Sequence, residues 1–249
     1  MFSFIKGFTD CFSGFGLILQ SGVKRFVIIP FFINIALFYS AFVLLSDQVD
    51  AWIKQLLPGW LSWLEWLILP LFYVTTLLAV FYTFTLVANL IASPFNSFLS
   101  SRVEANLTGT KPVDMNTDKL FKLIGRTLSS EIRKILYSIK WAIPLVILMV
   151  IPVINVAAPF AWILFAAWFF ALEYTDYPLA NRGLLFDDVR QYNRTNRMRA
   201  FGMGTGIFLL TSIPFVNFIA MPVAVAAATR LTVKIKQSDE KQNESRSNG

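Results

Sequence analysis

The sequence predicts an all-α integral membrane protein with two long transmembrane helices, two proline-broken hairpins that penetrate half of the bilayer, and amphipathic helices at the interface. The first observation is composition: of 249 residues, 56% are hydrophobic and 15% are charged, whereas soluble domains carry about 25% charged residues. The mean hydropathy is +0.59. With 25 Phe and 7 Trp, the chain has more apolar surface than one soluble core of this size buries.

Composition also excludes several kinds of chemistry. The chain has no histidine and one cysteine, Cys11. A Ser-His-Asp or Cys-His catalytic apparatus, a Cys/His zinc site and a disulfide within the chain therefore cannot form. There is no glycine-rich phosphate loop of the Walker type. We expect a protein that is not an enzyme and that needs no cofactor.

The second observation is a set of uncharged windows, two of which are long enough to cross a bilayer. Residues 26–46 form an uncharged stretch of 21 residues, with Pro30 near its start, where a missing backbone N–H is tolerated. Residues 66–101 are uncharged over 36 positions, which makes about 54 Å as a continuous helix. Because the hydrocarbon core is about 30 Å thick, we expect both windows to span the membrane and the second to extend beyond it.

The third observation is a repeated proline pattern in the other two windows, 141–172 and 200–229. The repeat pairs Ile151, Pro152 and Asn155 with Ile213, Pro214 and Asn217 at a constant offset of 62 residues. Each arm beside the prolines has about 12 to 14 residues, or about 18 to 21 Å of helix. An arm of that length does not cross the bilayer, so each window is predicted to be a half-spanning hairpin with its turn inside the protein. The alternatives are a structural plug or an oligomer contact.

The distribution of charge predicts the orientation. Residues 47–65 carry a net charge of −2, whereas residues 102–140 carry eight basic and four acidic side chains. Residues 173–199 carry five basic against four acidic side chains, and the tail from Arg230 carries five against three. The three basic segments share the cytoplasmic side only if each hairpin returns to the face from which it started. We therefore expect a multi-pass membrane protein with both termini in the cytoplasm.

Two amphipathic helices complete a single membrane domain over residues 1–236. In residues 2–20, Phe4, Phe8, Phe12, Phe15 and Leu19 recur at helical spacing, which is typical of a helix that lies along the membrane interface. Residues 119–140 place an apolar face rich in Leu and Ile opposite a basic face that includes Arg133 and Lys134. The polar segment 237–249 is predicted to be a disordered cytoplasmic tail.

A row of polar side chains lies within the long helix and continues toward two charged residues. The row consists of Thr85, Asn89, Ser93, Asn96 and Ser100, followed by Arg102 and Glu104. Spacings of three and four residues place the first five on one helix face. That face could line a water-filled path, with Asn34 of the first span as a further candidate. The alternative is close helix packing through small and amide side chains.

A candidate anion site precedes the first span, where Ser21 is followed by Gly22, Val23, Lys24 and Arg25. A helix N-terminus offers unpaired N–H groups and positive potential, and the glycine lets a ligand approach the backbone. The alternative is topological, since Lys and Arg at a cytoplasmic helix end also contact lipid phosphates.

The remaining charged residues indicate no hydrolase and no nucleic-acid partner. Glu173, Asp176, Asp187 and Asp188 have no metal-ligand spacing, and we expect them to be solvated or paired with nearby arginines. The net charge of +7 lies beside the spans, so it suits anionic lipid or an anionic solute better than nucleic acid.

Four stretches of the chain resemble the CysZ family of bacterial inner-membrane sulfate permeases. They are SGVKRFVIIPFFIN at 21–34, NLIASPFNSFLSSRVEANLTG at 89–109, EYTDYPLANRG at 173–183 and IPFVNFIAMPVAVAAAT at 213–229. The resemblance implies an oligomeric, channel-like permease that brings sulfate into the cytoplasm for cysteine synthesis. It also implies that sulfate binds at Gly22, Val23, Lys24 and Arg25. Here Val23 and Lys24 stand where the family usually has Leu or Ile and Arg, and Lys offers a point charge in place of a planar fork.

These observations lead to one hypothesis and two alternatives. In the hypothesis, sulfate binds at Gly22–Arg25 and passes along the polar face of the long helix, and the protein contacts membrane lipid and forms a homo-oligomer. The alternatives are a transporter of another oxyanion and a non-transporting membrane scaffold that uses the same features for packing.

Overall fold

The computed structural model describes residues 2–37, 39–40, 65–112 and 117–247, and every element in those ranges is a helix or a turn. The chain divides into two compact units, one of residues 1–27 with 96–249 and the other of residues 28–95. We describe each unit by itself. The second half of the predicted 26–46 span, from residue 41 onward, lies outside the described residues.

The smaller unit contains the beginning of the first predicted span and most of the second. A helix covers Arg25–Leu37. It corresponds to the first part of the predicted 26–46 span. Helix α4 covers Glu65–Thr108 as one element of 44 residues with Pro70 and Pro94 inside it. The window 66–101 is therefore a single continuous helix, as predicted from its length, and its last turns, from Asn96, belong to the larger unit.

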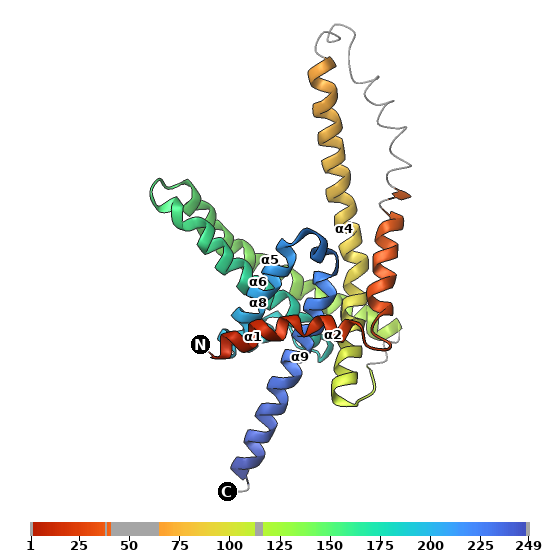
Figure 1. Ribbon diagram of the computed structural model, residues 1–249, viewed down its shortest axis with the longest axis vertical. Helices are drawn as coiled ribbons and strands as arrows, with labels where there is room; N and C mark the ends of the chain where they lie inside the picture. The colour runs from red at the N-terminus through yellow and green to blue at the C-terminus, as the bar shows by residue number, and fades with distance from the viewer. Residues whose placement is uncertain (1, 38, 41–64, 113–116, 248–249) are drawn as a thin grey trace. The chain divides into compact units, whose positions relative to one another are not determined.

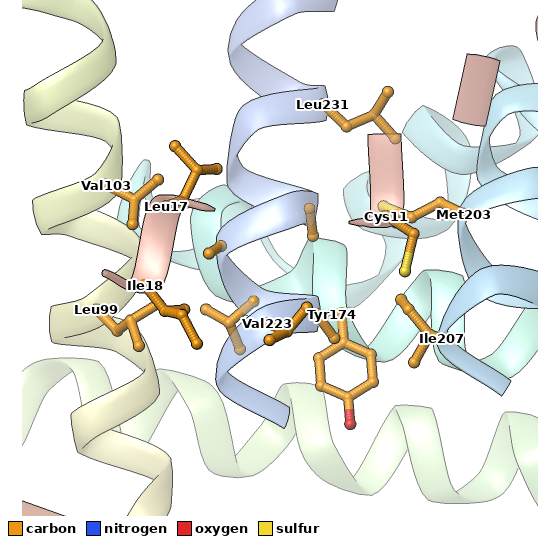
Figure 2. Close-up of a cluster of buried hydrophobic side chains, with 14 of the residues drawn as sticks. Cys11, Leu17, Ile18, Leu99, Val103, Tyr174, Met203, Ile207, Val223 and Leu231 are labelled. Atoms are coloured by element: carbon orange, nitrogen blue, oxygen red, sulfur yellow. The ribbon is translucent and has the colours of Figure 1, made fainter. Parts of the chain in front are cut away.

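The larger unit is a bundle in which α1 (Phe2–Phe12), α2 (Gly14–Ile18), α6 (Ala158–Asn181), α8 (Arg197–Ser212) and α9 (Pro214–Ser247) pack together (Figure 1). Every residue from Val223 to Thr229 of α9 is buried, because the segment VAVAAAT consists of small side chains that let neighbouring helices approach closely. Cys11, Tyr174, Met203 and Ile207 join this core from α1, α6 and α8 (Figure 2).

The two predicted turns lie where the prolines are, but residues 151–157 of the first turn are exposed and not buried within the chain as expected. Helix α5 (Thr117–Val150) ends just before Ile151 and Pro152, the chain turns with Val153 at a φ of 71°, and the short helix η2 (Ile154–Ala157) leads into α6. Helices α5 and α6 form an antiparallel hairpin (Figure 1). Between α8 and α9, Ile213 is extended and Pro214 begins the next helix. A residue before proline avoids the helical region, and proline is favoured at the first helical position.

The helices extend well beyond the uncharged windows. Helix α5 unites the predicted amphipathic helix 119–140 with the first arm of the 141–172 hairpin, and α6 continues past residue 172 to Asn181. Helix α9 continues through Ser247, whereas the sequence predicts a disordered tail from residue 237. The added residues are mostly good helix formers, and Lys236 and Glu240 form an i,i+4 pair at 3.9 Å. An uncharged window marks where a helix meets apolar surroundings, and it does not mark where the helix ends.

Two described helices are long and apolar enough to cross a membrane, Ile154–Asn181 and Val216–Ser245. Most of the apolar window of Ile154–Asn181 is not covered by the rest of the chain, whereas most of the window of Val216–Ser245 is buried. The first therefore presents its apolar surface outward, while the second is largely a core helix of the bundle.

The N-terminal segment 2–20 forms two helices, α1 and α2, with Ser13 between them. The side of α1 that faces the bundle carries Gly7 and Cys11, whereas Phe2, Phe12 and Leu19 are exposed. The predicted aromatic stripe is thus only partly covered by the protein. This arrangement leaves apolar side chains free for the membrane interface.

Glycines bring α8 into direct contact with α1 and α6. A Cβ atom on Gly202 would clash with the carbonyl oxygen of Phe4, and one on Gly204 would clash with that of Ala167. We expect Gly204→Ala to lower the free energy of unfolding by about 1–3 kcal/mol, because two backbones must separate to admit the methyl group.

The matched control is Gly16→Ala in α2, where an added Cβ meets nothing within 4 Å. This change should be neutral or should stabilise the protein by up to about 1 kcal/mol. Thermal unfolding of the detergent-solubilised variants checks both values. Equal unfolding temperatures for the two variants would show that the α6–α8 contact is not tight.

Candidate functional site

The segment before the first span forms a tight turn around Gly22. Gly22 has a φ of +79°, a conformation that glycine adopts without strain. The N–H of Val23 donates to the carbonyl oxygen of Gln20 at 3.1 Å, and the Val23 side chain is fully buried. Val23 therefore anchors the turn in the protein core, and its N–H is not free to bind a ligand.

Three other N–H groups of this segment remain available. Among the described residues, no backbone carbonyl oxygen accepts a hydrogen bond from the N–H groups of Gly22, Lys24 and Arg25. They precede or begin the helix Arg25–Leu37, so the positive end of its dipole adds to the potential there. The predicted anion site thus has free N–H donors, but they lie on both sides of Val23 and do not include it.

Arg102 of α4 lies directly against Gly22. A Cβ atom on Gly22 would lie 2.8 Å from Nε and 2.9 Å from Nη2 of Arg102, so a larger residue would push this guanidinium group away. The Nε of Arg102 is buried and has no hydrogen-bond partner among the described residues. A buried N–H without an acceptor is costly. An oxyanion bound beside Gly22 would supply the missing acceptor.

The two cationic side chains of the motif are held differently. Lys24 and Arg25 are both exposed, and the guanidinium carbon of Arg25 lies 4.7 Å from the centre of the Phe26 ring. The Phe26 ring in turn stacks on Phe98 of α4 at 5.9 Å. Since Phe98 and Arg102 are one turn apart on the same helix, α4 supports both the motif and Arg102. The direct contact of Arg102 with the Gly22 turn is not visible in the sequence, where the two are far apart.

The described part of the polar row on α4 is engaged in helix packing. Asn96 and Ser100 are buried, and the Ser100 hydroxyl lies 2.9 Å from that of Thr229 in α9. The Asn96 side-chain amide donates to the Tyr177 hydroxyl at 3.4 Å and to the Met221 sulfur at 3.1 Å. For these two residues the contacts are those of the packing alternative. The side chains of Thr85, Asn89 and Ser93 lie outside the described residues.

Glu104 and Asn34 have distinct surroundings. Glu104 accepts hydrogen bonds from Nε and Nη2 of Arg182 at 3.1 and 2.9 Å, which ties α4 to the end of α6. Its charge is thus compensated. In the smaller unit, the Asn34 side-chain oxygen is buried and has no hydrogen-bond partner among the described residues.

A buried lysine forms a charge cluster that sequence reasoning missed. The Nζ atom of Lys134 in α5 lies 2.9 Å from Glu131, 2.9 Å from Glu173 and 3.0 Å from Asp176, and its side chain is 4% exposed. The helical pattern places Lys134 on a solvated basic face, but the Lys134 side chain is buried against carboxylates of α6. The carboxylates of Glu173 and Asp176, which lie three positions apart and so share one face of a helix, were the available signal.

The charge cluster shifts the ionisation of its members in α5. Burial lowers the pKa of Lys134, but Glu173, Asp176 and Glu131 together raise it above its ordinary value of 10.5. Burial raises the pKa of Glu131, and the nearby Lys134 partly opposes that change. Because the pKa of Lys134 is higher in the folded chain, its contribution to stability is complete at neutral pH and is lost only as the pH rises through the raised value.

Other acidic side chains pair as the sequence suggests. Asp187 lies 2.6 Å from Arg133 and 3.3 Å from Arg190, and all three are at least partly exposed. Among the described residues, no group of three or more His, Cys, Asp or Glu side chains is arranged to hold a metal ion.

Cys11 provides a test of the core. Burial raises the pKa of its thiol from 9.0 to about 12, so the reactive thiolate is about one part in ten thousand at pH 8. We expect the folded protein to resist maleimide at pH 8 and the SDS-unfolded protein to react completely. Mass spectrometry of the two samples checks this, and rapid labelling of folded protein would contradict the packing of α1 against α8.

Comparisons with known proteins identify the family of the chain. A family model described as "Sulfate transporter CysZ/Etoposide-induced protein 2.4" matches residues 10–222. A sulfate transporter CysZ of Pseudomonas fluorescens (strain Pf0-1) is 40% identical over 225 residues, which cover 89% of this chain and 90% of that protein. One from Pectobacterium atrosepticum is 40% identical over 226 residues, covering 89% and 82%. One from Vibrio cholerae (strain O395) is 39% identical over 232 residues, covering 92% and 93%.

The matched family is one of sulfate transporters and not of enzymes. Together with the two helices that are apolar enough to cross a membrane, this makes the chain a membrane protein. The match spans the Gly22 turn, Arg102 and both proline-broken turns. On its sequence and over most of its length, this chain belongs to the sulfate transporter CysZ/etoposide-induced protein 2.4 family.

Proposed function

We propose that the protein is a channel-like permease that takes up sulfate across the bacterial inner membrane and feeds cysteine synthesis. The observation that carries the proposal is the guanidinium group of Arg102, which lies against Gly22 with a buried Nε that lacks an acceptor. A tetrahedral oxyanion offers acceptors on every side, and sulfate stays a dianion throughout the physiological pH range. The names of the relatives support sulfate as that anion.

In this proposal sulfate binds at Gly22, Lys24 and Arg25, with Arg102 as a further ligand and Val23 as the anchor of the turn. Positive potential attracts the anion, and free N–H groups and guanidinium donors replace part of its hydration shell. The fork of Arg102 supplies the planar donor set that Lys24 lacks. The site therefore has two guanidinium groups, from Arg25 and from Arg102.

The path beyond the site follows the polar face of α4. Thr85, Asn89 and Ser93, with Asn34, are its proposed lining. Asn96 and Ser100 bond to α6 and α9, so they line the path only when α4 separates from these helices. Their contacts are also the observation that favours the second candidate, a membrane scaffold in which the polar face serves packing alone.

We further propose that the two proline-broken hairpins penetrate half of the bilayer and that the protein works as a homo-oligomer. The exposed apolar arm from Trp141 to Val150 measures about 15 Å, which is half of the hydrocarbon thickness. Hairpins of that depth place all three basic segments, and both termini, on the cytoplasmic side. Two spanning helices in one chain do not enclose a pore, and further copies would complete it.

Uptake of labelled sulfate by liposomes that contain the purified protein tests the function. We expect uptake well above that of empty liposomes, with little inhibition by equimolar chloride. Uptake no faster than in empty liposomes would contradict the permease and favour the scaffold. Faster uptake of labelled phosphate than of sulfate would instead identify a transporter of another oxyanion.

A further inference from the structure

Two adjoining hollows lie against the α5–α6 hairpin, and no residue of the Gly22 turn lines them. One has a volume of about 600 Å³ and the other about 300 Å³. They share three lining residues, Tyr137, Trp141 and Arg194, and so form one continuous groove between α5, α6, α7 (Phe186–Thr195) and α8. We call it the hairpin groove.

One end of the hairpin groove is apolar. Leu145 of α5, together with Leu164 and Phe165 of α6, lines it on the side toward the hairpin turn. The surface beyond is also apolar, since Ile147, Val150 and Phe160 are exposed. In a membrane protein such a surface faces hydrocarbon. A hollow in it therefore fits an acyl chain.

The other end of the groove is basic. Asp187 is the one acidic residue that lines it, and it already pairs with Arg133 and Arg190. The remaining cations, Lys140, Arg194 and Arg197, form no ion pair with a carboxylate of the described residues. Three uncompensated cations from α5, α7 and α8 thus converge on one end of an apolar hollow. This end attracts an anion.

Aromatic side chains mark the boundary between the two ends. Trp168 donates through Nε1 to the Tyr137 hydroxyl at 3.0 Å, which leaves the Tyr137 hydroxyl hydrogen free to donate onward. Trp141 is half exposed beside Tyr137. Tyr and Trp concentrate at the level of lipid headgroups, where one edge of the ring is apolar and the other meets water.

We propose that the hairpin groove binds an anionic phospholipid, with its phosphate at Lys140, Arg194 and Arg197 and an acyl chain along Leu145, Leu164 and Phe165. The apolar arm from Trp141 to the hairpin turn is about 15 Å long, which matches the depth of one leaflet. Basic pockets between membrane helices are suited to anionic headgroups. A second copy of this chain fits less well, because its own copy of the groove brings the same positive charge.

Native mass spectrometry of the detergent-solubilised protein tests the proposal, with phosphatidylglycerol, cardiolipin and phosphatidylcholine added in turn. We expect the two anionic lipids to remain bound and phosphatidylcholine to be lost. In Arg194→Gln/Arg197→Gln, the affinity for phosphatidylglycerol should fall about 10- to 30-fold. The matched control, Lys236→Gln/Lys241→Gln, removes two exposed cations of α9 and should bind like the wild type.

A second variant and a competitor separate the other occupants. Leu164→Trp fills the apolar end without changing charge and should also weaken phosphatidylglycerol binding. Excess inorganic phosphate should not displace the lipid, and full displacement would identify a site for free phosphate. Equal retention of phosphatidylcholine, or wild-type affinity in both groove variants, would overturn the proposal. So would a change of oligomeric state in Arg194→Gln/Arg197→Gln on light scattering, since the groove would then be an interface between copies. None of these measurements depends on sulfate transport.

Discussion

Replacing Arg102 with glutamine is expected to lower the affinity of the protein for sulfate by about 10- to 100-fold. Hydrogen bonds to a charged group contribute about 1.5–3 kcal/mol each, and Arg102 places two N–H groups beside Gly22. Glutamine keeps a donor but loses the charge and the fork. Equilibrium binding of labelled sulfate to the detergent-solubilised protein measures the change.

Three further variants make this result specific. Arg102→Lys keeps the charge and should recover part of the affinity, whereas Lys236→Gln removes an exposed cation of α9 and should leave it unchanged. Gly22→Ala should weaken sulfate binding as well, because the methyl group displaces Arg102 and the turn requires a φ of +79°. Wild-type affinity for sulfate in both Arg102→Gln and Gly22→Ala would show that Arg102 is not part of the sulfate site.

Replacing Lys134 with methionine is expected to lower the free energy of unfolding by about 3–5 kcal/mol. Lys134 is the cation that faces Glu131, Glu173 and Asp176, and methionine would leave all three without it, including Asp176, whose side chain is 10% exposed. Breaking one side of a buried ion pair costs far more than the pair itself contributes. Thermal unfolding in detergent, followed by circular dichroism, measures the loss.

The neighbouring residue is the natural control for that change. Arg133 pairs with Asp187 on the surface, where both side chains are at least half exposed, and Arg133→Met should cost no more than about 1 kcal/mol. Adding Glu173→Gln and Asp176→Asn to Lys134→Met should restore much of the stability, because the uncompensated charges are then removed. A similar small effect of Lys134→Met and Arg133→Met would show that the cluster is solvated in solution.

The turns of the fold could be predicted from the sequence because proline acts locally. Pro152 and Pro214 disfavour a helical conformation in the residue before them, and the chain turns at both places. The lengths of the arms could not be predicted from charge, since a helix continues through charged residues when tertiary contacts support it. The pairing of Lys134 with α6 is such a contact.

The candidate site was predictable in part. The Gly22–Arg25 motif is contiguous in sequence, so its glycine, its cations and its place before a helix could all be recognised. Arg102 lies about eighty positions away, and only the fold shows that its guanidinium group occupies the space that Gly22 leaves open. The packing role of Asn96 and Ser100 could not be predicted from their spacing. A polar helix face has the same periodicity whether it lines a path or packs against α6 and α9.

The most direct test of the proposed site compares initial rates of labelled sulfate uptake by liposomes that contain equal amounts of wild-type protein or of Lys24→Ala/Arg25→Ala. The account predicts that the double variant, correctly folded by its unfolding temperature, transports sulfate at least about tenfold more slowly, since it loses two of the three cations of the site. Equal rates for the two proteins would contradict the proposal that sulfate passes through the Gly22–Arg25 site.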